Sequence, residues 1–437
     1  MDLFEELRKK HPLFIYHSYE LNESGFSFHF SIDQYHFYPC WKFDTTIINK
    51  NADRNVIDYA VFNIGMAELV SYWKCACCPE VEVRCGALNN EQISWWKKLY
   101  FNGLGEFFYR NGICSHISDF MNIKCVNNAP PVFDTAYNPE GFLIPVGGGK
   151  DSVVTLELLK KLGSTDKNTC YLINGLQAAK DTANTAGYDN VHILSVTRTI
   201  DKTLLELNKI GYLNGHTPFS SVVAFSSWLF AYILGKQYII LSNESSANES
   251  YVQGKEVNHQ YSKSTEFEAD FRFYSRKFLL PYPEYFSLLR PWSEWQIARE
   301  FVKHPIYFKE FRSCNLGSKA NVWCNKCAKC LYIYIMLAAF LDDAQLVDIF
   351  GKNLLDDEGL LDIFNGLAYA DYDKPFECVG TRDEINLSLS MACERRKNSL
   401  PFLLSEYMNK SHEQPISLDN FYDNNNFVPQ MFTKLLK

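Results

Sequence analysis

The first stretch with chemical potential is a run of glycines between an apolar segment and an amphipathic one. Phe142–Val146 is apolar, and Val154, Leu158 and Leu162 repeat at helical spacing further on. The residues between them that bear the chemistry are Gly147, Gly148, Gly149, Lys150, Asp151 and Ser152. A glycine turn from a strand into a helix N-terminus offers unpaired backbone N–H groups, and the helix dipole favours an anion there. The stretch predicts a phosphate site; the alternative is a glycine turn without a ligand.

Two common phosphate motifs do not fit this stretch. A Walker A loop needs glycine at the position of Ile144 and a hydroxyl residue directly after Lys150. A Rossmann fingerprint needs a third glycine where Ser152 stands. Another kind of phosphate loop is therefore required.

The glycine stretch opens a repeating strand–helix pattern. Strands are expected at 142–146, 169–173, 191–196 and 237–241, and helices at about 151–162, 177–186, 202–210 and 218–235. Thr217 and Pro218 would be the N-cap and first residue of the last helix. The alternation predicts an α/β fold with a doubly wound parallel sheet, in which ligands bind beyond the carboxyl ends of the strands near the switch in strand order.

That rule selects two more stretches besides the glycine loop. One is Gly215–Pro218, and the other is Ser242–Glu244, which follows the fourth strand. All three could face one nucleotide. For Asn243 and Glu244 the alternative is a plain polar turn.

A dense set of hydrogen-bonding side chains precedes another expected helix. They are Asn258, His259, Gln260, Tyr261, Ser262 and Lys263, with Ser264, Glu266 and Glu268 close behind. Such a set suits a polar substrate or a carboxylate. The segment also contains Ser264 and Thr265, either of which could cap a helix running through Tyr274, and both interpretations can hold at once.

Cysteines cluster in two places. Cys314, Cys324, Cys327 and Cys330 have the number and spacing for one tetrahedral, structural zinc ion; the alternative is four unrelated thiols. Cys75, Cys77, Cys78 and Cys85 do not match a familiar ligand spacing, so buried or reactive thiols are favoured over a metal there.

Three units are expected along the chain. Residues 1–126 would form an α+β domain with strands at 14–19 and 26–38 and helices at 56–73 and 92–108, and 127–131 would be a linker. Residues 132–345 would hold the nucleotide-binding sheet and the cysteine knuckle, and 346–437 would be helical. In the last unit Thr381–Glu384 is a capping box, preceded by a loop in which Glu377 and Cys378 are adjacent. That loop could also be a simple connector.

Composition restricts the class of protein. The chain has 437 residues, a net charge of −8 and an isoelectric point near 5.7, which argues against a nucleic-acid surface. The apolar stretches 222–234 and 331–341 are too short to span a bilayer. The N-terminal segment reads as a charged helix and not as a signal peptide, so the 14 cysteines are expected to be reduced in a cytoplasm.

The motif Gly147–Ser152 resembles the SGGxDS loop of the PP-loop ATP pyrophosphatases, with Gly147 in place of serine. A PP-loop followed by the cysteine knuckle is similar to the queuosine-precursor synthases, but a longer resemblance covers nearly the whole chain. It runs through the strings Glu68–Lys74, Gly103–Phe108, IPVGGGKDS, Ser242–Glu244, VNHQYSKSTEFE, the knuckle and PFECVGT. Through these strings the chain resembles the UDP-N-acetylmuramoyl-L-alanyl-L-glutamate epimerases. The resemblance implies a PP-loop fold, ATP and Mg²⁺, a UDP-linked muramoyl dipeptide as substrate, and inversion of its terminal L-glutamate in peptidoglycan precursor synthesis.

Roles for individual residues follow as hypotheses. The N–H groups of Gly147–Lys150, with Ser152, would hold pyrophosphate, Lys150 would neutralise charge, and Asp151 would bind Mg²⁺. Asn243 and Glu244 would position the adenylate or the metal. The substrate carboxylates would be held by His259, Tyr261 and Lys263. Inversion needs an acid/base on each face of the carbon, and the candidates are His259, Lys263, Glu377, Cys378 and the pair Cys77 and Cys78.

Two alternatives to an epimerase remain from the sequence. The chain could be a PP-loop enzyme that forms an amide, a nitrile or a thio group at the expense of ATP. It could also be a nucleotide-binding sensor without turnover.

Overall fold

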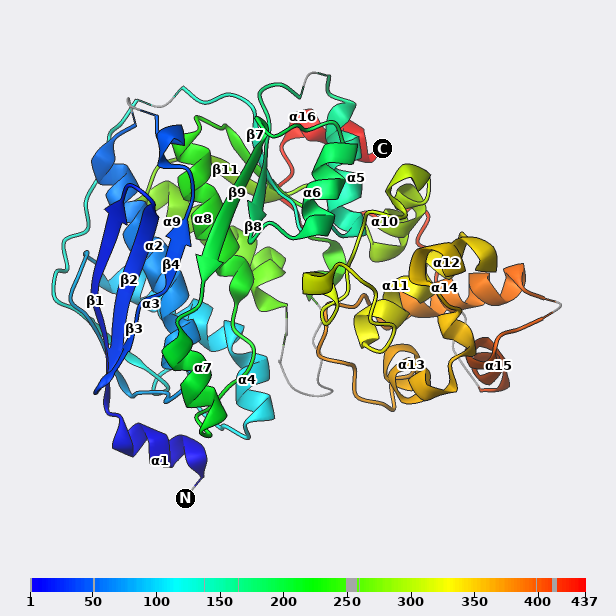
Figure 1. Cartoon of the computed structure of the whole chain (residues 1–437), viewed down its shortest axis with the longest axis horizontal. Helices are drawn as coiled ribbons and strands as arrows, with labels where there is room; N and C mark the ends of the chain where they lie inside the picture. Colours follow the sequence, from blue (N-terminus) through cyan, green and yellow to red (C-terminus); the bar gives the residue numbers. More distant parts are fainter. Residues whose placement is uncertain are drawn as a thin grey trace.

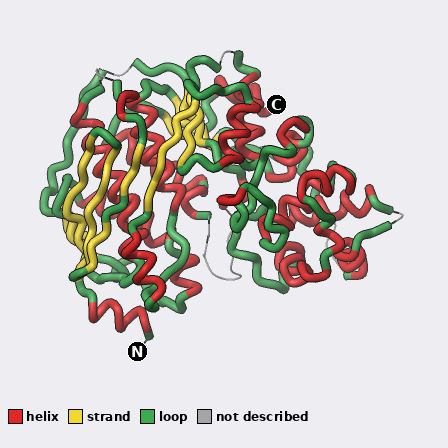
Figure 2. The backbone as a smooth tube through the Cα atoms, in the orientation of Figure 1, coloured by secondary structure: helices red, strands yellow, loops and turns green. Residues whose placement is uncertain are grey.

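The computed structural model describes residues 2–49, 52–136, 138–163, 165–248, 258, 260–397, 399–410 and 415–437. These residues form a mixed α/β body built on one large sheet, with a helical lobe beside it (Figures 1 and 2). Among the described residues no helix is both long and apolar enough to cross a membrane.

Eleven strands from the described residues form the sheet. They are β1 (Leu13–Asn22), β2 (Gly25–Ile32), β3 (Tyr35–Phe37), β4 (Cys40–Lys42), β5 (Glu80–Val83), β6 (Asn122–Cys125), β7 (Phe142–Pro145), β8 (Thr169–Ile173), β9 (Ile193–Thr199), β10 (Tyr238–Leu241) and β11 (Glu284–Ser287). Their order is β11-β10-β7-β8-β9-β4-β2-β1-β5-β6, and β3 pairs with β2.

The half of the sheet from β11 to β9 is entirely parallel. In it β8 and β9 lie on one side of β7, and β10 and β11 lie on the other. This is a doubly wound order with its switch point between β7 and β10, a strand order that the sequence left open. The carboxyl ends of these strands lie at one edge of the sheet, where such folds bind ligands.

The other half of the sheet is mixed and joins the first without a break. The short strand β4 pairs antiparallel with both β2 and β9, with Trp41 opposite Arg198. Residues 1–126 and the central strands therefore share one sheet. The division of the chain into three domains stays a prediction.

The helices cover both faces of the parallel half of the sheet, cover one face of the strands β1–β3, and build the lobe (Figure 1). They are α1 (Leu3–Lys10), α2 (Arg54–Trp73), α3 (Asn90–Gly103), α4 (Gly105–Arg110), α5 (Lys150–Lys160), α6 (Gln177–Thr185), α7 (Lys202–Lys209), α8 (Phe219–Ile233), α9 (Thr265–Phe278), α10 (Glu294–Phe301), α11 (Ala328–Ala338), α12 (Asp343–Phe350), α13 (Leu361–Ala368), α14 (Arg382–Arg395), α15 (Phe402–Asn409) and α16 (Gln430–Thr433). The caps predicted for α9 and α14 are confirmed: Ser264 caps the first, and Thr381 and Glu384 form a capping box on the second.

Three local predictions are wrong. The expected strand 26–38 is two strands, because Asp33 adopts a left-handed φ of 48° and turns the chain. The expected helix 92–108 divides at Leu104, which lies between two glycines and has non-helical backbone angles. Pro218 has a non-helical ψ of 68° and is the N-cap of α8, so this helix begins at Phe219 and Thr217 precedes its cap.

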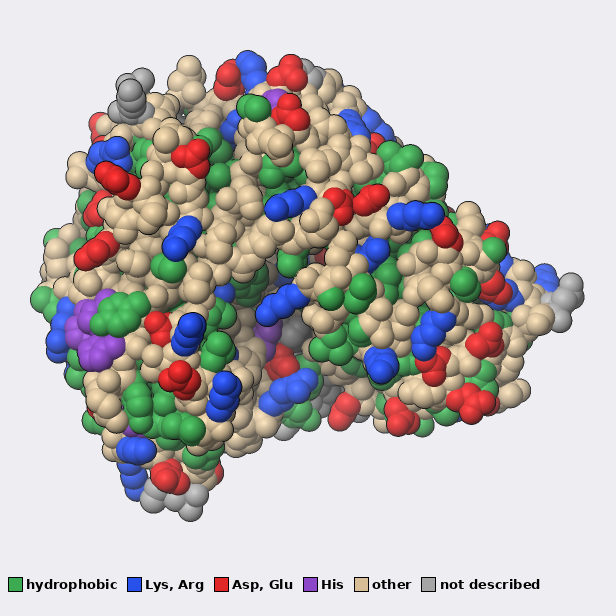
Figure 3. All heavy atoms as spheres, in the orientation of Figure 1, with side chains coloured by type: hydrophobic (Ala, Val, Ile, Leu, Met, Phe, Trp, Pro, Cys, Tyr) green, Lys and Arg blue, Asp and Glu red, His purple; other side chains and the backbone are tan. Residues whose placement is uncertain are grey.

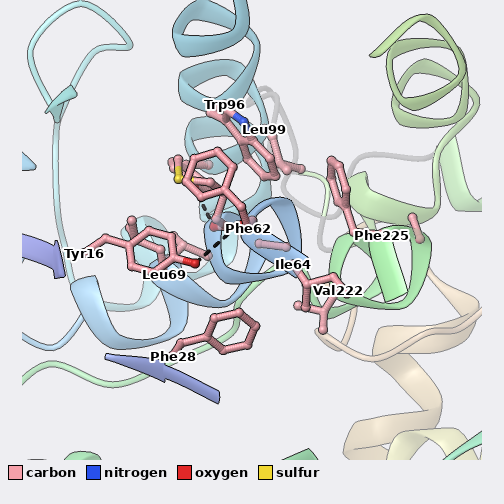
Figure 4. Packing of buried hydrophobic residues seen from close by; sticks show 14 of the residues in the cluster. Tyr16, Phe28, Phe62, Ile64, Leu69, Trp96, Leu99, Val222 and Phe225 are labelled. Carbon is pink, nitrogen blue, oxygen red and sulfur yellow. Dashed lines mark hydrogen bonds between the residues drawn. The ribbon is translucent and has the colours of Figure 1, made fainter. Parts of the chain in front are cut away.

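Side chains alternate between two apolar cores on either face of the parallel strands. Leu143 of β7 belongs to the core under α2 and α8, whereas Ile144 belongs to the core under α5 and α6. Helix α2 lies deep in the first core. Figure 4 shows its Phe62 close to Tyr16 of β1, and the Phe62 and Tyr16 rings stack at 5.8 Å.

The C-terminal segment returns to the sheet. Phe432 of α16 is fully buried against Phe142, Tyr238 and Phe286 of three neighbouring strands, with ring centroids 5.4, 5.3 and 5.1 Å away. The last residues of the chain thus complete the core of the parallel half.

Replacing this ring tests the anchor. We expect Phe432→Ala to lower the free energy of unfolding by about 3–5 kcal/mol, since it removes a fully buried aromatic side chain. The measurement is the midpoint and slope of urea-induced unfolding. Met431→Ala is the matched control, because Met431 lies in the same helix but is 49% exposed, and we expect a change below about 0.5 kcal/mol. Equal effects of the two substitutions would contradict the conclusion that the buried Phe432 ring holds the C-terminal segment on the sheet.

Candidate active site

The glycine loop lies at the switch point, between the end of β7 and the start of α5. Gly148 has a φ of +82°, and a Cβ there would lie 2.6 Å from the backbone of Ala178 and Ala179, so only glycine fits. Gly149 is the N-cap of α5 and provides no side-chain cap. The Gly147 N–H donates to Ser152 Oγ at 3.1 Å, which ties the loop to the first turn of the helix. The first turn of α5 is thus built for a group that accepts hydrogen bonds.

A buried cluster of carboxylates lies beside this loop. Oxygen atoms of Asp151, Glu244 and Glu294 all lie within 4.8 Å of one another. Glu244 follows β10 and Glu294 begins α10 after β11, so three different strand ends contribute. Lys150 is fully buried and donates to both Asp151 and Glu294. The structure thus brings the glycine loop and Glu244 together, as the sequence predicts.

The cluster concentrates negative charge away from water. Burial raises the pKa of Glu294 to about 7, against the opposing effect of Lys150. Burial, and next the charge of Asp151, also raises the pKa of Glu244. A group of hard oxygen atoms that repel one another in this way is suited to bind a divalent cation such as Mg²⁺.

Glu384 links the cluster to the helical lobe. Its carboxylate accepts from the Glu294 N–H at 2.7 Å and from the Thr381 N–H at 2.6 Å. Burial, and next the charge of Glu294, raises its pKa to about 7. The start of α14 is therefore held against the start of α10.

A lysine and a cysteine extend the cluster on the side of the lobe. Lys263 Nζ lies 3.2 Å from Cys378 Sγ, and Lys329 Nζ donates to the Cys378 carbonyl oxygen. The charge on the Cys378 sulfur, and less strongly those of Glu244 and Asp151, raises the pKa of Lys263. Cys378 thus lies between two cations next to the carboxylates.

A buried arginine holds the backbone of two site residues in place. Arg290 donates to the carbonyl oxygens of Glu244 and Lys263, and it pairs with Glu268 at 3.1 Å. Asn243 is fixed differently, because its Nδ2 donates to Ser287 Oγ of β11 at 3.1 Å. Its amide thus helps to join β10 to β11.

The rest of the polar segment before α9 has other contacts. Asn258 donates to the Ala247 carbonyl at 3.0 Å and accepts from the Gln260 N–H at 2.7 Å. The Tyr261 hydroxyl lies 3.4 Å from Asp270, and Ser262 is buried. His259 lies outside the described residues. Lys263 is thus the described member of this segment whose side chain reaches the carboxylates.

The cysteine knuckle adjoins the site. The sulfur atoms of Cys314, Cys324, Cys327 and Cys330 lie within 4.8 Å of one another at the start of α11. Glu377 lies on this knuckle, where it accepts from the Lys329 N–H at 2.7 Å and from Asn315 Nδ2 at 3.2 Å. The knuckle therefore supports the loop that carries Cys378.

The second group of cysteines is part of the core. Cys75, Cys77 and Cys78 are fully buried, Cys85 is half-buried, and burial raises the pKa of each thiol. Cys77 Sγ donates to the Lys74 carbonyl oxygen at 3.3 Å. These residues behave as small apolar side chains.

Four residues of the site are not predicted as site residues from the sequence: Lys329, Arg290, Glu294 and Glu384. Glu384 is predicted only as part of the capping box of α14. Glu294 looks like an ordinary acidic residue in the first turn of a helix capped by Ser293 and Gln296. Glu294 could be predicted from its position in the chain, because it follows a buried strand whose carboxyl end lies at the ligand edge of the sheet.

Fold and site together define an α/β protein whose ligand site, a glycine loop beside a carboxylate cluster, lies at the switch point of a doubly wound sheet. Residues 5–288 match the model of the MurL N-terminal domain, and residues 310–420 match that of the MurL C-terminal domain. The chain is 33% identical over 353 residues to a UDP-N-acetyl-alpha-D-muramoyl-L-alanyl-L-glutamate epimerase of Xanthomonas oryzae, covering 79% of this chain and 76% of that one. A protein of the same name from Salinispora tropica is 32% identical over 334 residues, 75% of this chain and 71% of that one. The chain belongs to this epimerase family and is an enzyme of the isomerase class.

We propose that the knuckle binds one structural zinc ion, since four thiolates complete a tetrahedral site and leave no open position. Metal analysis of the purified protein should then give one zinc per chain. Cys327→Ser should lose the zinc and lower the melting temperature, because the ion holds the start of α11. Cys114→Ser, which changes an exposed thiol, is the control and should keep the zinc and the wild-type melting temperature. A stable protein without zinc would contradict the assignment.

Proposed function

We propose that this enzyme inverts the terminal L-glutamate of UDP-N-acetylmuramoyl-L-alanyl-L-glutamate to D-glutamate and cleaves ATP to AMP and pyrophosphate as it does so. The names of the relatives support the substrate and the inversion. The observation that carries the use of ATP is a glycine loop that meets a carboxylate cluster at the switch point.

The loop is suited to the phosphates of ATP. The α5 N-terminus has no side-chain cap, and its N–H groups and dipole favour an anion. Around Gly147 the space is open, since a Cβ there would meet nothing within 4 Å. Together with the resemblance of Gly147–Ser152 to a PP-loop, this supports a PP-loop fold in the parallel half of the sheet.

The carboxylate cluster is suited to Mg²⁺. Asp151, Glu244 and Glu294 offer oxygen ligands within 4.8 Å of one another. The raised pKa values of Glu244 and Glu294 reflect buried charge that a cation would stabilise. When bound, the ion would neutralise phosphate charge. Lys150 and Lys263 add positive charge beside the loop.

Activation explains why ATP is needed. Removing a proton from the carbon next to an ionised carboxylate would place a second negative charge on the same group. In the proposed first step an oxygen of that carboxylate attacks the α-phosphorus of ATP, and the bond to pyrophosphate breaks. The acyl-adenylate carries no carboxylate charge, so its Cα–H bond is far more acidic.

The remaining steps return the enzyme to its starting state. The Cα proton leaves on one face and a proton is added on the opposite face. Water then cleaves the acyl–phosphate bond to give AMP and the D-glutamate carboxylate. The sum is inversion of one centre with hydrolysis of ATP to AMP and pyrophosphate. Cys378, beside Lys263 and next to the carboxylates, is one of the two groups that move the proton.

The test is incubation with ATP, Mg²⁺ and the UDP-muramoyl dipeptide in D₂O. We expect pyrophosphate release, deuterium at the glutamate Cα and D-glutamate in the product. Asp151→Asn should lower pyrophosphate release about 10²–10³-fold, because it removes a carboxylate ligand of the Mg²⁺ ion that would neutralise the phosphates. Asp383→Asn, an exposed carboxylate next to Glu384, is the control and should retain the activity.

Two results would count against this function. ATP cleavage without deuterium at Cα would indicate a PP-loop enzyme that joins the activated carboxylate to another group. Inversion without ATP cleavage would refute the activation step.

A further inference from the structure

Two strings through which the chain resembles the epimerase family have no role in the activation half of the reaction. They are Glu68–Lys74 at the end of α2 and Gly103–Phe108 at the junction of α3 and α4. In the structure both contact the loop Gly215–Pro218. Lys74 donates to the Gly215 carbonyl oxygen, and a Cβ on Gly103 would lie 2.6 Å from the Pro218 ring. The two strings therefore hold this loop in place.

The loop presents His216 with a carboxylate behind it. His216 Nδ1 lies 3.8 Å from Glu106 Oε2, and the His216 side chain is 29% exposed. Glu106 is itself buried and pairs through Oε1 with Arg110 Nε at 2.6 Å. A carboxylate at this distance acts on an imidazole ring through its charge. His216 thus has the environment of a general acid/base that ligands can reach.

The position of this pair matches the ligand edge. The loop precedes α8, whose chain continues into β10, so its N-terminus lies at the carboxyl edge of the sheet with the glycine loop. Figure 3 shows a hollow between the body and the helical lobe, bordered by lysine and arginine side chains.

The helix that carries Glu106 also contacts the loop that carries Cys378. The rings of Tyr109 and Phe376 lie 5.5 Å apart, and the Arg110 guanidinium lies 5.2 Å from the Phe376 ring centroid. Phe376 precedes Cys378 by two residues. Helix α4 therefore connects the two sides of the hollow. The loop of His216 lies on the side of the body, and the loop of Cys378 lies on the side of the lobe.

We propose that His216, positioned by Glu106, is the second proton-transfer group of the inversion, acting on the face of Cα opposite Cys378. This inference rests on the proposed function. In each direction of the inversion, one of these two groups acts as the base. It takes the proton from Cα, and the electron pair of the broken Cα–H bond is delocalised into the acyl group. The acid on the other side of the hollow then loses its proton to form the new Cα–H bond. The two groups exchange protons with water before the next turnover.

Three of the other candidate residues from the sequence are less suited to this role. Cys77 and Cys78 are fully buried in the core, and Glu377 is engaged by the knuckle. A single base on one face would return the proton to the same side. Two groups from opposite sides of the hollow meet the requirement of inversion.

The experiment compares His216→Gln with Cys378→Ala in the full-length enzyme with ATP, Mg²⁺ and either epimer of the UDP-muramoyl dipeptide in D₂O. We expect inversion to fall about 10²–10⁴-fold in both variants, since each loses one acid/base, while pyrophosphate release falls less than about tenfold. Each variant should still exchange the Cα proton of one epimer, and the two variants should exchange opposite epimers. Glu106→Gln should show the same one-epimer pattern as His216→Gln, which a merely structural role would not produce.

His304→Gln is the matched control, because His304 Nδ1 also lies 3.8 Å from a carboxylate, that of Glu157, away from the hollow. It should invert at the wild-type rate. The inference is overturned if His216→Gln inverts within about threefold of wild type, or if it loses pyrophosphate release together with inversion. If the wild type itself neither releases pyrophosphate nor incorporates deuterium, the proposed function fails instead.

Discussion

Lys150 is a fully buried cation, and the arrangement of the whole site depends on the carboxylates that neutralise it. An unpaired ammonium in such a position would cost several kcal/mol. Asp151 supplies one partner from the same helical turn, and Glu294 supplies the other from α10. Because the Glu294 N–H is bound by Glu384 of α14, the same pairing that fixes the glycine loop also fixes the helical lobe. Sheet, loop and lobe are thus joined through one buried group of charges.

The parts of the fold with a clear local pattern were predictable. The strands at 142–146, 169–173 and 237–241 and the helices that follow them agree with the structure to within a few residues, because apolar alternation and helical spacing are local signals. The pairing of β4 with β9 was not predictable in this way. It joins short strands that are about 150 residues apart, and β4 has only 3 residues. Such contacts depend on tertiary packing rather than on periodicity.

The residues of the candidate site also fall into a group that could be predicted from local sequence and a group that depends on tertiary packing. Glycines, Asp151, Glu244, Lys263 and Cys378 were found because they belong to unusual strings, and the structure groups them. Glu294 and Glu384 were missed because each looks like a normal residue in the first turn of a helix. The sequence predicted that the loop of His216 lies at the ligand edge, but its carboxylate partner is 110 residues away in the chain, so only the fold shows the pair.

The return of α16 to the sheet has a consequence for synthesis of the protein. The rings of Phe142, Tyr238 and Phe286 leave the ribosome long before Phe432, which covers all three. At about 5–20 residues per second, the roughly 290 residues from the first of these rings to the last take about 15–60 s to make. Until Phe432 is made, the aromatic rings at the β11 end of the sheet are open to chaperones and to other nascent chains. The nascent chain therefore passes through an aggregation-prone stage that ends only when Phe432 covers these rings.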